Sequence, residues 1–276
     1  EITLVGMGRN NFLTEAMQTK DAGEIEHITE MGRLTTHVVA NTADFISSQR
    51  IKDGIVVLAS GEALTIGMVK KQIRLWLAEA CAEAPEDTIF SIGRDAAVPH
   101  SSGNPTDVIR AGIPIVFDIF PCQAGGGYFY DFTRTWCVGY VSDEALAVYE
   151  DVLTAYQRAV ATLALEQPLF RYQKSTCDYF ESRGHATILN GAAESGYIHS
   201  LSHGLGLNIH ERPFTGISLE MSDKIYANSV FTVEPGLYYP EKEIGVRIED
   251  TYWAKSDGSF ACLAYYPYDL LLPVKN

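Results

Sequence analysis

The sequence predicts an α+β fold, because helix-like and strand-like stretches follow one another in blocks rather than alternating singly. Two helix-periodic stretches come first, a strand pair carrying two acids follows, and two more helical stretches precede the last strands. A sheet built from such blocks needs helices to cover its apolar face. We therefore expect a curved, mostly antiparallel sheet with helices packed on one side.

The first two helices are expected in the amino-terminal third of the chain. Residues 22–48 carry apolar side chains at helical intervals, namely Ile25, Ile28, Leu34, Val38 and Phe45. Residues 61–83 do the same with Leu64, Met68, Ile73, Leu77 and Cys81. Apolar residues repeating every three or four positions form one face of an amphipathic helix. Both helices should pack on the same side of the sheet.

A β-hairpin carrying two acids is expected next. Asp118 ends the apolar run Ile115–Phe117, and Asp131 lies within residues 128–135, which are rich in aromatic residues and threonine. Three consecutive glycines at 125–127 separate the two stretches. Such residues favour strands and the glycines favour a turn. The hairpin should place the two carboxylates near each other.

Helices are expected again over residues 142–166 and 173–195, followed by strands that also carry acids. Ser142 is a good N-cap, and the acids after it suit the positive end of a helix dipole. Glu234 follows the apolar run Val230–Val233, and Glu249 ends the run Val246–Ile248. Acids on buried strands require partners.

Five residues have the side chains of a shared metal centre: Asp118, Asp131, His203, Glu234 and Glu249. Four ionised carboxylates in one buried site would have strongly raised pKa values unless cations compensated them. Two divalent ions balance four negative charges. Imidazole with carboxylates and no cysteine suits manganese, and also cobalt, zinc or iron. A two-metal hydrolytic centre is the natural interpretation.

The composition of the chain bears on its binding partners and its cellular location. The 276 residues carry a formal charge of -14 without a Lys/Arg cluster, which argues against a nucleic-acid or anionic-membrane partner. Five scattered cysteines without CxxC spacing, and the absence of a twenty-residue apolar span, favour a cytoplasmic protein. We expect one catalytic domain over residues 1–276, with residues 1–15 a remnant of a linker from a missing amino-terminal domain.

Four motifs carry a resemblance to a known family, and they lie at residues 131–135, 203–211, 232–238 and 246–250. With them the chain resembles the pita-bread metallopeptidases, the family of methionine aminopeptidase, aminopeptidase P and prolidase. The resemblance spans roughly residues 15–270 and is greatest to the catalytic domain of Xaa-Pro aminopeptidase or prolidase. It implies the pita-bread fold and two bound divalent ions.

The resemblance also assigns roles to the five ligands. Asp131 and Glu249 would bridge the ions, Asp118 would complete one shell, and His203 with Glu234 would complete the other. A hydroxide between the ions would be the nucleophile, and Glu234 would carry its proton to the leaving nitrogen. One departure is that the hairpin is slightly longer than usual in the family, with Phe120 where a glycine is frequent.

Other residues around the ligands also receive roles from the resemblance. Of the catalytic residues, His100 would contact the substrate and His210 would stabilise the oxyanion. In the substrate pocket, His199 and Tyr238 match the Xaa-Pro branch. Arg247, two residues before a ligand, would pair with an acid and fix its orientation, or form an ordinary strand-face salt bridge.

The expected activity is hydrolysis of the Xaa-Pro bond at the amino end of peptides. Prolidase is the first alternative, because a dipeptidase needs a cation for the proline carboxylate, and Arg212 is the nearest one unless Glu211 neutralises it. Methionine aminopeptidase, and a creatinase-like hydrolase or binding module of the same fold, are further alternatives. Peptides with proline second are the expected partners, and the resemblance suggests a homodimer.

Overall fold

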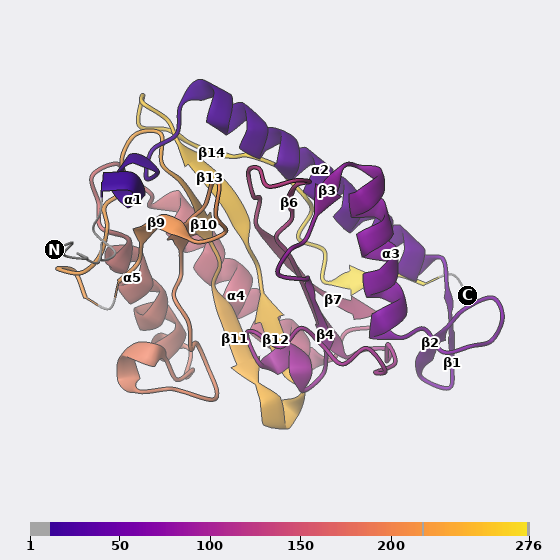
Figure 1. The fold of residues 1–276 in the computed structure, drawn as a ribbon. Helices are drawn as coiled ribbons and strands as arrows, with labels where there is room; N and C mark the ends of the chain where they lie inside the picture. Colours follow the sequence, from indigo (N-terminus) through magenta and orange to yellow (C-terminus); the bar gives the residue numbers. More distant parts are fainter. Residues whose placement is uncertain (1–11, 217, 275–276) are drawn as a thin grey trace, which may run out of the picture.

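The computed structural model describes residues 12–216 and 218–274, and it has the expected α+β architecture (Figure 1). The interpretation of residues 1–15 as a linker remnant falls mostly outside the described residues. The α-helices are α1 Phe12–Ala16, α2 Ala22–Ser47, α3 Ile66–Glu79, α4 Asp143–Ala161 and α5 Leu169–Ser182. No described helix has the length and apolar character needed to cross a membrane.

Two sheets supply the strands that matter for the site. The four-stranded sheet has the order β15-β7-β5-β4, with bounds Leu271–Leu272, Phe132–Val138, Pro114–Ile119 and Ile89–Ile92. The five-stranded sheet has the order β14-β13-β10-β8-β9, with bounds Phe260–Cys262, Asp250–Ala254, Val230–Val233, His203–Gly204 and Glu211–Phe214. All neighbours are antiparallel except β15 and β7. The mostly antiparallel sheet is therefore confirmed.

Three shorter pairs complete the described strands. They are β1 Arg50–Lys52 with β2 Ile55–Val57, β3 Ala82–Glu83 with β6 Cys122–Gln123, and β11 Gly236–Tyr239 with β12 Ile244–Arg247. An isolated bridge between Thr133 and Glu249 links the end of β12 to β7. Close approach also matters here, because a Cβ on Gly245 would lie 1.8 Å from the carbonyl oxygen of Ala96. Glycine thus lets β12 run against the segment that leads to His100.

Helix α2 agrees most closely with its predicted range, and local sequence signals explain where it begins. A capping box begins α2, because the side chain of Asp21 accepts from the Glu24 amide at 2.8 Å and the Glu24 carboxylate accepts from the Asp21 amide at 2.7 Å. The predicted apolar face is buried at Ile25, Ile28 and Val38. The helix predicted for residues 22–48 is confirmed.

The other three helices are shorter than predicted. The helix expected over 61–83 begins at Ile66, because the Thr65 hydroxyl caps it and the preceding residues pair with β2 instead. Ser142 caps α4 as predicted, but that helix ends at Ala161 rather than at residue 166. The helix expected over 173–195 was placed too late: it starts after Pro168 and ends at Ser182, shortly before Gly184 at φ +88°.

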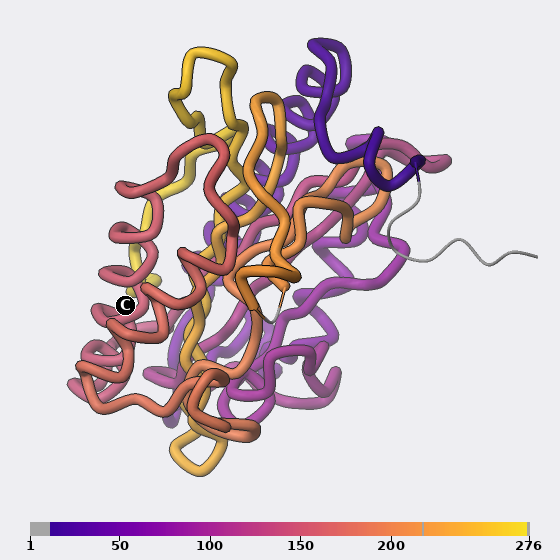
Figure 2. The backbone as a smooth tube through the Cα atoms, turned by 90° about the vertical axis from the view of Figure 1, so that its left-hand side faces the viewer, coloured from indigo at the N-terminus to yellow at the C-terminus, as the bar shows by residue number. Residues whose placement is uncertain are grey.

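Two apolar cores hold the helices against the strands. Side chains of α2 and α3 pack with β4, β5 and β7 in one core, and side chains of α4 and α5 pack with β10, β12 and β13 in the other. Figure 2 shows α4 and α5 together at one edge of the molecule. None of these four helices contributes a described residue to the large cleft, so the cleft opens on the strand face opposite the helices.

Candidate metal centre

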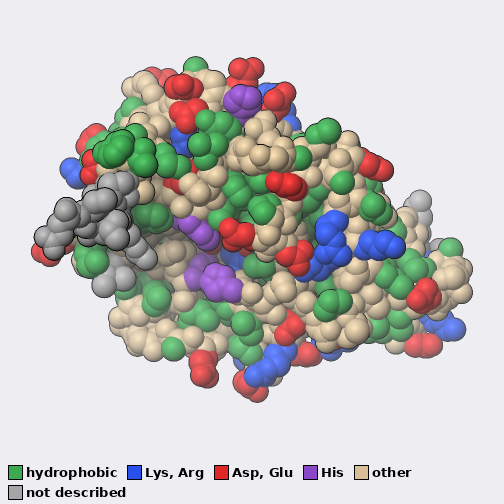
Figure 3. Space-filling view, viewed as in Figure 1, with side chains coloured by type: hydrophobic (Ala, Val, Ile, Leu, Met, Phe, Trp, Pro, Cys, Tyr) green, Lys and Arg blue, Asp and Glu red, His purple; other side chains and the backbone are tan. Residues whose placement is uncertain are grey.

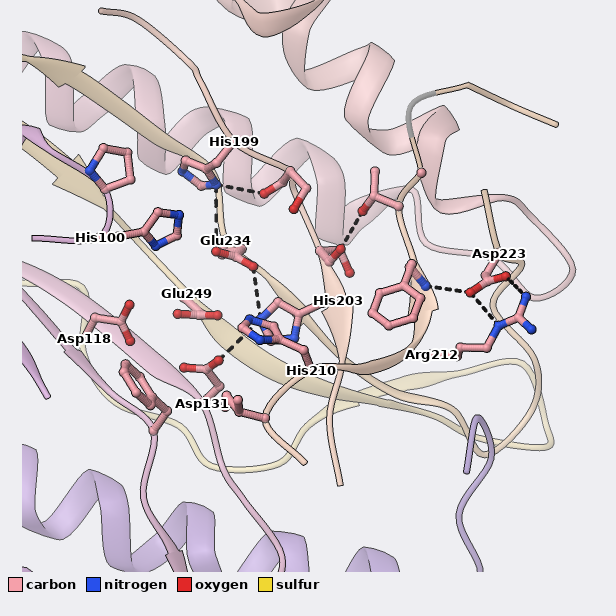
Figure 4. Close-up of a pocket in the computed structure, with 18 of the residues that line it drawn as sticks. His100, Asp118, Asp131, His199, His203, His210, Arg212, Asp223, Glu234 and Glu249 are labelled. Carbon is pink, nitrogen blue, oxygen red and sulfur yellow. Dashed lines mark hydrogen bonds and ion pairs between the residues drawn. The ribbon is translucent and has the colours of Figure 1, made fainter. Parts of the chain in front are cut away.

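The five predicted ligands come from five separate strand ends and meet in one cleft. Asp118 lies on β5, Asp131 immediately before β7, His203 on β8, Glu234 immediately after β10, and Glu249 between β12 and β13. All five line a cleft of about 1480 Å³. Figure 4 shows their side chains converging. Antiparallel neighbours bring these residues together although 131 positions separate the first from the last (249 minus 118).

Distances place the His203 ring between Asp131 and Glu234. Its Nε2 lies 3.4 Å from Oδ2 of Asp131 and 3.3 Å from Oε1 of Glu234. Asp131, His203 and Glu249 each offer a ligand atom within 4.8 Å of the other two. The Nδ1 of His203 lies 3.1 Å from the carbonyl oxygen of Gly204. A proton on Nδ1 would leave Nε2 as a metal ligand, the arrangement found in many metal sites.

Two buried carboxylate oxygens in the cleft have no hydrogen-bond partner among the residues that the structure describes. They are Oδ1 of Asp118 and Oε1 of Glu249. The second oxygen of each is held, because Thr133 Oγ1 donates to Glu249 at 2.6 Å and Arg247 donates to Asp118 at 2.5 Å. An orphaned buried anion is costly unless a cation satisfies it. The donor set and these free oxygens therefore fit divalent ions.

Arg247 is buried behind the acids with only 3 % of its surface exposed. Besides Asp118, its guanidinium donates to the Tyr238 hydroxyl at 2.7 Å and to the carbonyl oxygen of Pro99 at 3.2 Å. The first of the two sequence interpretations, pairing with a ligand acid, matches this geometry. The contact to Pro99 also ties Arg247 to the loop that carries His100.

The predicted histidines line the same cleft, and Figure 3 shows histidine side chains at its mouth beside acidic ones. His210 packs edge-on against His203, with ring centroids 4.4 Å apart. His199 Nε2 lies 2.9 Å from the Tyr238 hydroxyl. Tyr238 itself is fully buried, and its hydroxyl is hydrogen-bonded to two residues that line the cleft, His199 and Arg247. His100 is exposed at the rim.

Burial gives the acids unusual proton affinities in the absence of ions. It raises the pKa of Asp118 to about 7 against the opposing charge of Arg247. Burial, with repulsion from Asp131, also raises the pKa values of Glu249 and Glu234. For His203, burial lowers the pKa, but the hydrogen bond to Asp131 and the charge of Glu234 outweigh it and raise the pKa to about 9. Protons thus compensate the charges that ions would neutralise.

A pH dependence of metal binding follows from these shifts. The carboxyl of Asp118 has a pKa of 3.8 ordinarily and about 7 here, so the ion-free fold binds more protons than the unfolded chain between these values. Its stability should therefore fall as pH rises through this window. Bound ions displace those protons, so the rise in Tm on adding Mn²⁺ should be larger at pH 7.5 than at pH 5.5. Calorimetry at both pH values measures it, and equal rises would contradict the assignment.

The segment that carries the predicted ligand Glu249 is held by a residue whose role was not predicted from the sequence. Arg134 is fully buried and donates to Asp250 at 2.9 Å and to the carbonyl oxygens of Thr133 and Glu249, both at 2.9 Å. It therefore joins β7 to the segment that carries Glu249. One sequence signal could have indicated that this strand faces the segment of Glu249. Asp131, Thr133 and Thr135 alternate and so share one strand face, and the two threonine hydroxyls donate to Glu249 and to the carbonyl oxygen of Arg247.

Arg212 is neutralised, but by a different acid from the one expected. Its guanidinium forms a two-point pair with Asp223, in which Nε lies 2.9 Å from Oδ2. Glu211 instead forms a buried ion pair with Lys20, with 2.8 Å between Nζ and Oε2. The alternative that Glu211 neutralises Arg212 does not hold, because Glu211 and Arg212 are neighbours on β9 and point to opposite faces of the strand.

A comparison with known families shows which family the chain belongs to. The profile of metallopeptidase family M24 matches residues 26–256, which include all five predicted ligands. The chain belongs to metallopeptidase family M24. Membership confirms the resemblance seen in the sequence, and this M24 chain has the pita-bread α+β fold expected from it.

Individual relatives of this M24 chain divide between two activities. It is 32% identical over 208 residues to the Xaa-Pro dipeptidase of Pyrococcus furiosus, covering 74% of this chain and 56% of that protein. The X-Pro aminopeptidase structure from Thermotoga maritima has a TM-score of 0.77 and 26% identity, covering 94% of this chain and 66% of that one. An uncharacterized peptidase of Staphylococcus haemolyticus is 28% identical, and the match covers 64% of its length. The M24 chain thus spans less than two thirds of the length of each of these relatives.

Proposed function

We propose that this chain is a single catalytic domain that hydrolyses the Xaa-Pro bond at the amino end of peptides, with two divalent ions in the cleft. The observation that carries the proposal is the convergence of His203 and four carboxylates, two of which have buried oxygens without a partner. Family membership supports a peptidase. The bound ions would activate a water molecule and polarise the scissile carbonyl.

The chain's own residues have defined roles in this proposal. Asp118, Asp131, His203, Glu234 and Glu249 would hold the two ions. His210, whose ring packs against that of His203, would donate a hydrogen bond to the developing oxyanion. Burial and the charge of His203 lower the pKa of His210. At neutral pH the His210 imidazole would therefore be an uncharged hydrogen-bond donor.

His100 and Glu234 complete the proposed catalytic group. His100 would contact the substrate from the rim, where burial and Arg247 lower the pKa of its imidazole. Glu234, whose pKa is raised, would take the proton from the attacking water and pass it to the leaving nitrogen. Behind them, His199, Tyr238 and Arg247 form one hydrogen-bonded group that would shape the substrate pocket.

Charge pairing in the cleft favours an aminopeptidase over a dipeptidase. A dipeptidase must hold the free carboxylate of proline, which calls for a cation with unused donors. The two arginines of the cleft are committed, Arg212 to Asp223 and Arg247 to Asp118. Among the described lining residues, the remaining Lys or Arg side chain is Lys224, which is exposed at the rim. In a peptide that continues past proline, an uncharged amide carbonyl takes the place of the proline carboxylate.

Three peptides test the proposed activity. With Mn²⁺ added, we expect cleavage of Gly-Pro-Ala-amide at a kcat/KM at least about tenfold above that for Gly-Pro, because the dipeptide carboxylate finds no free arginine. Metal-stripped protein is the blank. A preference for Gly-Pro would reverse the choice in favour of prolidase, cleavage of Met-Ala-Xaa would indicate methionine aminopeptidase, and no cleavage would reject the proposal.

The remaining parts of the proposal concern metal and setting. Manganese is the proposed ion, since carboxylate-rich sites with one imidazole suit it, and cobalt, zinc or iron would also bind. The cysteine pattern supports a cytoplasmic location. A homodimer is proposed from the resemblance alone. Metal analysis of protein purified without added ions would test the first point.

A further inference from the structure

Five buried side-chain atoms among the described residues have no hydrogen-bond partner, and four of them belong to residues of the cleft. Besides the oxygens of Asp118 and Glu249, these are the hydroxyls of Thr88 and Ser202, while the fifth, Ser91, lies outside the cleft. Ions account for the carboxylates. A buried hydroxyl without a partner is unfavourable, and native proteins seldom leave one unpaired. The cleft hydroxyls are therefore available for a ligand.

Ser202 has the better position of the two, because it directly precedes the proposed ligand His203. Its surroundings are fixed from several sides. The amide of Leu201 donates to Gln173 at 2.6 Å, and the amide of His203 donates to the Thr232 hydroxyl at 3.1 Å. Thr215 donates to the carbonyl oxygen of Ser202 itself at 2.5 Å. The hydroxyl is thus presented from a rigid segment, which lowers the entropy cost of binding.

The chemistry of Ser202 is that of recognition rather than catalysis. No base contacts its Oγ, which is only an unpaired donor and acceptor. Beyond it, the cleft is lined by the uncharged Phe214, Thr215, Met221 and Tyr226, together with the Arg212–Asp223 ion pair and the exposed Glu220 and Lys224. An unpaired hydroxyl next to the proposed metal ligands suits an amide group of a peptide main chain.

We propose that the Ser202 hydroxyl hydrogen-bonds the main chain of the substrate on the carboxyl side of the scissile bond. This inference rests on the proposed exopeptidase activity. The amino end of such a substrate stops at the carboxylates, so only the leaving peptide can continue along a wall that reaches the rim. Ser202 with the wall from Phe214 to Tyr226 is the subsite that recognises substrates longer than dipeptides.

The test compares Ser202→Ala with Ser91→Ala. Both remove one buried, unpartnered hydroxyl, with 2 % and 1 % of the residue exposed, but only Ser202 lines the cleft. Neither variant should lose stability, since no hydrogen bond is broken. In Mn²⁺-loaded protein, Ser202→Ala should lower the ratio of kcat/KM for Gly-Pro-Ala-amide to that for Gly-Pro about tenfold, and Ser91→Ala should leave this ratio unchanged.

A second readout does not depend on turnover. Calorimetry should show that Ser202→Ala weakens binding of the product Pro-Ala-amide to the Mn²⁺-loaded protein about tenfold, with metal content unchanged. Equal affinities in the two serine variants would overturn the inference and leave the hydroxyl to ordered water. The inference would also be overturned if the loss of kcat/KM depended on the size of the substrate's first residue and not on the length of the peptide. Absence of all Xaa-Pro cleavage rejects the proposed function, while the product affinities still test Ser202.

Discussion

Replacing Asp131 with asparagine should lower kcat/KM more than about 100-fold while the fold is retained. Asp131 is buried, faces Nε2 of His203 at 3.4 Å, and offers its oxygen in the same group as Glu249. An amide has the same shape but lacks the charge that a bridging ligand supplies. Since loss of a residue that merely supports a ligand costs 10–100-fold, loss of the ligand itself should cost more.

The measurement is steady-state hydrolysis of Gly-Pro-Ala-amide together with the metal content of the purified variant. Asp53→Asn is a suitable control, because Asp53 is exposed at φ 51°, a conformation that asparagine tolerates well. Circular dichroism should show the same spectrum for all three proteins. Full activity with two bound ions in the Asp131 variant would contradict its assignment as a bridging ligand.

Replacing Arg134 with methionine should destabilise the protein by about 3–5 kcal/mol, the usual cost of removing one partner of a buried ion pair. The guanidinium is fully buried and pairs with Asp250, whose other oxygen accepts from Tyr156 at 2.5 Å and Tyr268 at 2.8 Å. It also lies over the ring of Phe132, 4.3 Å from the centroid. Methionine would fill part of the space but leave the Asp250 carboxyl without its cation.

Urea unfolding with linear extrapolation measures this loss. Arg94→Met is the matched control, because Arg94 is 64 % exposed and pairs at 3.1 Å with Glu241, which is 88 % exposed. Such surface pairs contribute at most about 1 kcal/mol. If the two variants lost the same small amount, Arg134 would not be the residue that joins β7 to the segment carrying Glu249.

The sequence by itself determined the features that depend on neighbours along the chain. Helical periodicity predicted the helix over residues 22–48, and Ser142 marked the start of α4. Apolar runs ending on acids predicted that Asp118, Glu234 and Glu249 lie on strands or directly beside them, as they do. Periodicity and caps act within one or two turns, so they can be read from the chain alone.

Helix ends were less predictable where a distant strand competed for the same residues. Residues 61–64 continue the apolar pattern of α3, yet the amide of Leu64 donates to the carbonyl oxygen of Val56 instead. The end of α5 depends on Gly184, which the apolar pattern does not weigh. Tertiary pairing overrides local preference in the first case, and turn chemistry does so in the second.

Only the tertiary structure decided which side chains face one another across the cleft. It pairs Arg212 with Asp223 rather than Glu211, and it gives Arg247 to Asp118, 129 residues away. It also leaves the Ser202 hydroxyl without a partner among the described residues, while the groups around it are hydrogen-bonded. These pairings depend on strand register and on how the two sheets meet, since a shift of one residue turns every side chain to the other face. The sequence therefore predicts the ligands, and the packing of distant strands determines which oxygens and hydroxyls remain free to bind.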